Sequence, residues 1–177
     1  LNEPRSMPLE FFDNYPELKG KQEGLVVALC TSDKRVLEYV EKSVEDLCRA
    51  VPGIGGFFTI TMSENLTHCK SRGEEDECEK CKNPPIYKLI TDVMHAISRG
   101  IKKVDENIKL IAWTWSWKGR MSDEEFELCI KNLPEGTIVQ SNSEALKPKN
   151  YSNGYIVKYV VAEKKYYISN ALPIGHG

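Results

Sequence analysis

The stretch Gly56-Phe57-Phe58-Thr59-Ile60-Thr61-Met62-Ser63 is a short apolar run rich in aromatic and β-branched residues, and it predicts a buried strand. After Pro84-Pro85, apolar residues recur at helical spacing over residues 86–104, which predicts a helix of about five turns. Residues 108–117 predict the next strand. Strand, helix and strand in this order are typical of a parallel sheet with right-handed crossovers.

The same alternation continues on both sides of this unit. Residues 25–30 form a wholly apolar run that predicts an earlier strand, and residues 36–48 show helical spacing after Ser32 and Asp33, two residues that cap helices well. A capping box at residues 122–125 opens a short helix, and residues 137–142 predict a fourth strand. We therefore expect an α/β fold in which four parallel strands neighbour one another.

The C-terminal part follows another pattern. Residues 154–161 and 164–169 predict two strands joined by Ala162-Glu163, which indicates a C-terminal β-hairpin. Residues 65–83 are polar, carry cysteines and resemble neither element, so we interpret them as an insertion loop. The expected organisation is a single domain over residues 1–177.

Composition excludes several classes of protein. The 177 residues are 41% hydrophobic, so the chain can bury a core, and 24 basic against 26 acidic residues are not segregated, which disfavours nucleic-acid binding. No apolar run approaches the roughly 20 residues that cross a bilayer. Six cysteines are too few for a disulfide scaffold and favour a reducing, cytoplasmic compartment. The first residue, Leu1, and the loop-like residues 172–177 suggest a piece of a longer protein.

Polar residues follow each predicted strand, where ligands bind in parallel α/β folds. Glu64 directly follows an apolar strand, so a half-buried position can raise its pKa and make it a general acid, with Asn65 beside it to orient a ligand. At the end of the fourth strand, Asn142 is a candidate substrate-binding residue, as Asn65 is, and Glu144 is a second catalytic candidate. The alternative for Glu64 is a solvated loop residue.

Trp113, Trp115 and Trp117 alternate along the predicted strand 108–117 and are expected on one face of it. Trp117 would reach the mouth of the site, where it and Trp115 stack on sugar rings, whereas Trp113 is expected to pack. The alternative is that all three pack against a helix.

The insertion loop carries His68 and Cys69, followed after eight residues by Cys78-Glu79-Lys80-Cys81. These four soft ligands, His68, Cys69, Cys78 and Cys81, are enough for a tetrahedral structural zinc that pins the loop. The alternatives are a redox pair formed by Cys78 and Cys81, and a Cys69 that is merely buried.

Residues 55–69, GGFFTITMSENLTHC, and the CEKC motif at residues 78–81 resemble a group of large bacterial proteins with a glycoside-hydrolase-type (β/α)8 barrel, distantly related to family 20 hexosaminidases. Residues 1–8, 28–32, 111–117 and 167–170 support the resemblance. It implies that the chain supplies about strands three to six of a TIM barrel. The rest of the barrel, or a second copy, is then needed for closure, since a whole barrel takes about 250 residues.

Family 20 enzymes carry an Asp-Glu pair after strand four, and the matching position here is Ser63-Glu64. The resemblance therefore implies a proton-donating Glu64 but not the Asp that steers an acetamido group. Two functions follow as hypotheses. The first is a glycoside hydrolase that needs no cofactor, inactive as this piece alone, with Glu64 as acid and Glu144 or another carboxylate as its partner. The second is a non-catalytic glycan-binding or structural barrel with a metal-stapled loop.

Overall fold

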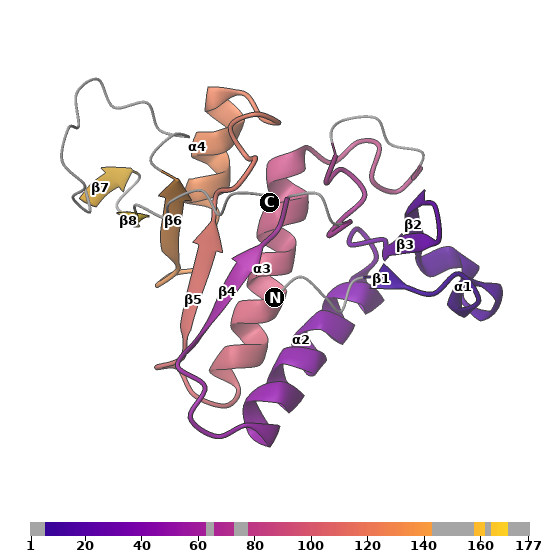
Figure 1. Ribbon diagram of the computed structural model, residues 1–177, viewed down its shortest axis with the longest axis horizontal. Coiled ribbons are helices and arrows are strands. Elements are labelled where there is room, and N and C mark those ends of the chain that lie inside the picture. Colours follow the sequence, from indigo (N-terminus) through magenta and orange to yellow (C-terminus); the bar gives the residue numbers. More distant parts are fainter. Residues whose placement is uncertain (1–5, 63–65, 73–77, 143–157, 162–163, 170–177) are drawn as a thin grey trace, which may run out of the picture.

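The computed structural model describes residues 6–62, 66–72, 78–142, 158–161 and 164–169 (Figure 1). Its larger sheet has the strand order β4-β5-β6-β8-β7. Neighbours from β4 to β8 are parallel, and β7 is antiparallel to β8. The bounds are β4 Gly56–Ile60, β5 Lys109–Trp113, β6 Ile138–Asn142, β7 Lys158–Val161 and β8 Lys164–Ser169. The expected parallel sheet is confirmed for β4, β5 and β6.

A second, smaller sheet holds the first predicted strand and corrects its assignment. β3 (Val26–Leu29) lies between β1 (Ser6–Met7) and β2 (Lys19–Glu23), and it is antiparallel to both. The expectation that residues 25–30 join the parallel strands is therefore wrong. Between β1 and β2 the chain forms two short helices, α1 (Phe11–Asn14) and the 3-10 helix η1 (Pro16–Leu18).

Three helices agree with the sequence pattern. α2 (Lys34–Ala50) is capped by Asp33, whose side chain accepts a hydrogen bond from the Arg35 amide. α3 (Ile86–Lys102) begins directly after the two prolines. α4 (Asp123–Lys131) opens with the predicted capping box between Ser122 and Glu125. Among the described residues no helix is both long and apolar enough to cross a membrane.

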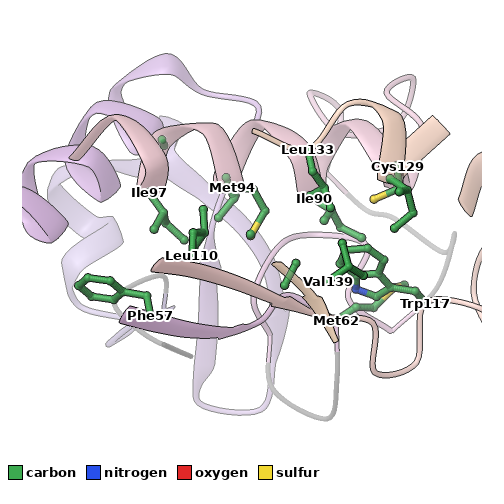
Figure 2. Packing of buried hydrophobic residues seen from close by; sticks show 14 of the residues in the cluster. Phe57, Met62, Ile90, Met94, Ile97, Leu110, Trp117, Cys129, Leu133 and Val139 are labelled. Carbon is green, nitrogen blue, oxygen red and sulfur yellow. The ribbon is translucent and has the colours of Figure 1, made fainter. Parts of the chain in front are cut away.

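The main core lies between the larger sheet and its helices. α2 packs against α3, and α3 covers one face of β4 and β5 (Figure 1). Figure 2 shows Met94 and Ile97 of α3 pointing at Leu110 of β5, while Trp117 and Met62 fill the far end of the same cluster. Alternate residues of β4 and β5, and Val139 of β6, face this core, which fixes the orientation of these three strands.

The strands at the C-terminal end pair as two antiparallel partners. Residues 162–163, which would join them, lie outside the described residues, so a hairpin stays a prediction. The β/α units expected of a barrel are present in β4-α3-β5-α4-β6. Their continuation into a closed (β/α)8 barrel also stays a prediction.

Gly100 of α3 marks the closest approach of α3 to α2. A Cβ at this position would lie 2.4 Å from the Glu41 carbonyl oxygen and 3.0 Å from Val44 Cβ. We expect Gly100→Ala to lower the free energy of unfolding by about 1–3 kcal/mol, because the backbone of α2 must shift. Urea denaturation measures this. Gly55→Ala, where a Cβ meets nothing within 4 Å, is the control, and equal stability of the two variants would contradict the prediction.

Candidate metal centre

Four cysteine sulfurs meet between the two sheets. The Sγ atoms of Cys30, Cys69, Cys78 and Cys81 all lie within 4.8 Å of one another. The Sγ of Cys30 is 3.5 Å from that of Cys78 and 3.5 Å from that of Cys81. All four cysteines are free, and Cys78 alone of the four is half-buried while the others are buried. We call these residues the sulfur cluster.

The sulfurs come from three segments, and the one that carries Cys30 is distant in sequence from the other two. Cys30 directly follows β3, and its amide donates to the Leu18 carbonyl at 2.9 Å. Cys69 lies in the turn at residues 66–72, beyond the carboxyl end of β4. Cys78 and Cys81 form a tight turn ahead of α3, in which the Cys81 amide donates to the Cys78 carbonyl at 2.9 Å. The cluster therefore joins the small sheet to the chain that runs from β4 into α3.

A buried network of hydrogen bonds shapes the turn that carries Cys69. The Ser71 hydroxyl oxygen accepts from the Thr67 amide at 2.9 Å and from the His68 amide at 2.8 Å, and it donates to the His68 carbonyl at 2.7 Å. The Thr67 hydroxyl donates to the Thr61 carbonyl just beyond β4. These bonds tie the turn to the end of the strand, so the position of Cys69 is set by β4.

Gly20 of β2 makes room for the Cys69 sulfur. A Cβ at Gly20 would stand 2.7 Å from Cys69 Sγ and 2.8 Å from the Ala28 carbonyl oxygen. Only a residue without a side chain leaves space for the sulfur against this strand. The Cys69 sulfur therefore packs directly against β2 of the small sheet, in the space that Gly20 leaves.

Two lysines hold the chain around Cys78 and Cys81. The Lys80 ammonium donates to the Asp33 carboxylate at 2.8 Å and to the Glu17 carbonyl at 2.7 Å. Lys70, only 3% exposed, donates through Nζ to the carbonyls of Lys82 at 3.2 Å and Pro84 at 3.0 Å. Backbone carbonyls that have no partner in a helix or strand are satisfied in this way.

The pKa values of the cysteines in the sulfur cluster are shifted in opposite directions. The pKa of Cys81 is well below that of an ordinary thiol, because the Cys30 thiol and then the Cys69 thiol hydrogen-bond to its sulfur, and the Ser32 hydroxyl adds to the effect. Hydrogen bonding by Cys69 likewise lowers the pKa of Cys78 to about 7. The pKa of Cys69 is raised, since its thiol donates to Cys30, Cys78 and Cys81 and is buried. Four sulfurs this close cannot all be thiolates unless a cation lies among them.

The donor set and its dimensions fit a single soft ion. Zinc binds thiolate at about 2.3 Å, so a tetrahedral site places its sulfurs about 3.8 Å apart. Four thiolates select zinc or iron over magnesium and calcium, which prefer oxygen. An iron–sulfur cluster puts several iron and sulfide atoms between its cysteines and needs wider spacing. The sulfur cluster therefore has the dimensions of a site for one tetrahedrally bound soft metal ion, such as zinc.

The structure brings three of the four predicted ligands together. Cys69, Cys78 and Cys81 are brought together, but the fourth sulfur belongs to Cys30, which the sequence interpretation did not include. His68 lies outside the cluster, and its Nδ1 accepts a hydrogen bond from the Lys70 amide at 3.2 Å. Adjacent residues rarely reach the same ion, which argues against His68 and Cys69 as ligands of one ion. The sequence does contain one indication of Cys30 as a ligand, because it lies at the end of a predicted strand, where ligand-binding residues are expected.

The three tryptophans do not share one face of a strand. β5 ends at Trp113, and Ser116 has a φ of 61°, so the chain turns instead of extending. Trp117 is fully buried, and its Nε1 donates to the Thr61 hydroxyl at 3.1 Å. The expectation that Trp117 reaches the mouth of a site is therefore wrong. Trp115 is 38% exposed and packs on Trp113, with ring centroids 4.8 Å apart.

The carboxylates expected at the strand ends cannot be placed. Glu64, Asn65 and Glu144 lie outside the described residues. Asn142 is the last residue of β6, but its side chain is likewise outside the description. Their roles stay predictions.

Asp33 connects the cap of α2 to the turn between Cys78 and Cys81, and this link should depend on pH. Hydrogen bonds from Arg35, and also from Lys80, hold the pKa of Asp33 well below its usual range. A carboxyl group with a lowered pKa stabilises the fold at pH values above about 4, its value in the unfolded chain, and this contribution is lost as the pH falls further. We expect Asp33→Asn to lower the free energy of unfolding at pH 7 by about 1 kcal/mol or less, since both cations are partly exposed.

Urea denaturation at pH 7 and pH 3 tests this expectation, and the difference from the unmodified protein should shrink at the lower pH. Asp46→Asn is the matched control, because Asp46 is 59% exposed and pairs with Lys42 on the surface of α2. A difference at Asp33 that is the same at both pH values would contradict the assignment.

Comparison with protein-family models, curated proteins and solved structures finds no match to this chain.

Proposed function

We propose that the chain is a zinc-stapled α/β domain, in which Cys30, Cys69, Cys78 and Cys81 bind one zinc ion with a structural role. The observation that carries this proposal is the convergence of four free sulfurs within 4.8 Å from three separate segments. With four cysteine ligands, zinc keeps no open position for a reacting water. The ion would therefore stabilise the fold and take no part in chemistry.

The surroundings of the sulfur cluster explain why an ion is useful there. Residues 66–72 and 78–85 contain no helix or strand, so few backbone hydrogen bonds hold them. Their apolar support is the small group formed by Cys30, Cys69, Cys81 and Leu89, with Cys78 packed against it. Because a site of this kind does not exist in the unfolded chain, the binding free energy of zinc adds to the stability of the fold.

Metal analysis of the purified protein tests the proposal, and we expect about one zinc ion per chain. Cys69→Ser should reduce this to near zero, because the buried ligand that lies against Gly20 is lost. We also compare the protein in free zinc at about 1,000 times the dissociation constant with the protein after a strong chelator has removed the zinc. The free energy of unfolding should be about 4 kcal/mol lower without zinc.

The control for Cys69→Ser is Cys48→Ala, which removes a buried cysteine outside the sulfur cluster and should leave one zinc ion bound. The proposal would be rejected if the purified protein contained no zinc and also bound none when zinc was added to its buffer.

A second proposal concerns carbohydrate, and one observation favours it. Phe58, Trp113 and Trp115 form a row of aromatic side chains, with centroid distances of 5.4 Å and 4.8 Å between neighbours. Phe58 and Trp113 alternate with core residues along β4 and β5, so they lie on the face of the sheet opposite α3. Exposed aromatic faces stack on the C–H faces of sugars, and the end of this row lies at the carboxyl edge of parallel strands, where ligands bind.

The same face supports the proposal of a (β/α)8 barrel. Ile60, Ile111 and Ile138 are half-buried on it beside Phe58 and Trp113. Parallel sheets are usually covered on both faces, so an apolar second face is expected inside a barrel. Further strands, from another part of the protein or from a second copy, would cover it. Within such a barrel Glu64 would be the general acid of a glycoside hydrolase, with Glu144 as a candidate partner.

Trp115→Ala tests the carbohydrate proposal. We expect about a tenfold loss of affinity for a bound oligosaccharide, because one stacking interaction is removed. Screening on a glycan array followed by titration calorimetry measures the effect. Tyr39→Ala removes an aromatic side chain of similar exposure from α2 and should leave affinity unchanged. Binding that survives in Trp115→Ala, or absence of any glycan ligand, would reject the aromatic row as a sugar site.

A further inference from the structure

One hydroxyl group outside the four cysteines is in hydrogen-bond contact with the sulfur cluster. The Ser32 hydroxyl lies 3.2 Å from Cys81 Sγ, which is within hydrogen-bond distance for sulfur. Cys81 is fully buried and Ser32 is half-buried, so water competes little for this bond. In the described part of the chain, Cys81 is the partner of this hydroxyl.

Helix capping does not account for the hydroxyl of Ser32. Asp33 is the N-cap of α2, and its carboxylate accepts from the Arg35 amide at 3.1 Å. Ser32 stands one residue earlier and does not bond to the first turn of the helix. Its position is instead fixed from both sides, by Cys30, whose carbonyl accepts from the Asp33 amide at 3.0 Å, and by the cap itself. The local backbone thus holds the hydroxyl close to the sulfur.

The negative charge of the proposed zinc site explains why a hydrogen-bond donor is useful beside Cys81. A zinc ion with four thiolates carries a net charge of about −2, which a buried site must offset with hydrogen-bond donors and nearby positive charge. α2 is 17 residues long and begins two residues after Ser32, so the positive end of its dipole faces the same region. The Lys80 ammonium lies in the turn between Cys78 and Cys81, but the Asp33 carboxylate pairs with it at 2.8 Å and offsets its charge.

We propose that Ser32 is a positioning residue of the zinc site, whose hydroxyl donates to the Cys81 thiolate and strengthens the binding of the ion. This inference rests on the zinc site proposed above. Groups that hydrogen-bond to metal ligands fix the orientation of those ligands, and their loss weakens metal binding by roughly 10- to 100-fold. Ser32 makes the corresponding bond here, although it never touches the ion.

The test compares the zinc affinity of Ser32→Ala with that of the unmodified protein, by competition with a chromophoric chelator. We expect affinity to fall at least about tenfold in Ser32→Ala and to be retained in Ser32→Thr, which keeps the hydroxyl. Ser43→Ala, in the middle of α2, is the matched control and should bind zinc as the unmodified protein does.

Cobalt substitution separates the hydrogen bond from a packing effect. Loss of a donor to the thiolate raises the energy of the sulfur electrons, so the sulfur-to-cobalt charge-transfer band of Ser32→Ala should move to longer wavelength. Unchanged affinity and an unchanged band in Ser32→Ala would overturn the role of Ser32 and leave the zinc site standing. Weaker binding shared by Ser32→Thr, with no movement of the band, would assign the effect to packing and overturn it as well. An unmodified protein that binds no zinc would reject the site itself.

Discussion

Four sulfur atoms from three segments must share one small volume, and much of the N-terminal half of the chain is arranged to let them do so. The small sheet contributes Cys30 and the glycine that makes room for Cys69, and β4 contributes the anchored turn that carries Cys69. Two separate apolar groups lie on either side, one around Phe12 and Val27 and one between the larger sheet and its helices. α2 contributes to both groups, with Val36 in the first and Val40 and Val44 in the second, and the sulfur cluster forms a third group of its own. A cation is what would let four adjacent thiols ionise together.

Helices and strands of the larger sheet could be predicted because their signals are local. The stripe of α3, the Asp33 cap of α2 and the capping box of α4 each lie within one segment. The partner of a strand is not a local property. β3 is apolar enough for a parallel sheet, but it pairs with β2, whose Lys-Gly-Lys-Gln-Glu sequence has no strand pattern. Residues 25–30 were therefore assigned to the parallel sheet, because nothing local in their sequence identifies β2 as the partner.

The site was predictable to the extent that its ligands are close in sequence. Cys78 and Cys81 share one short motif and Cys69 lies in the same loop, whereas Cys30 joins them only because β3 and the loop after β4 meet in space. The prediction that the three tryptophans lie on one face of a strand was wrong for a related reason. The spacing of Trp113, Trp115 and Trp117 suits an extended strand, but the indole of Trp117 finds a hydrogen-bond acceptor in Thr61 and a buried position only after the chain turns at Ser116.

The unequal burial of the four sulfurs separates the rate of ion exchange from its equilibrium. Three of the four cysteines are buried and Cys78 is half-buried, so Cys78 would be the ligand of the proposed ion that solvent reaches most easily. A competing ligand arriving from solution would then displace Cys78 first, and this residue would influence how fast the ion leaves. All four sulfurs would contribute to how strongly the ion is held. Evolution or design could therefore tune residence time at Cys78 while leaving the remaining coordination sphere intact.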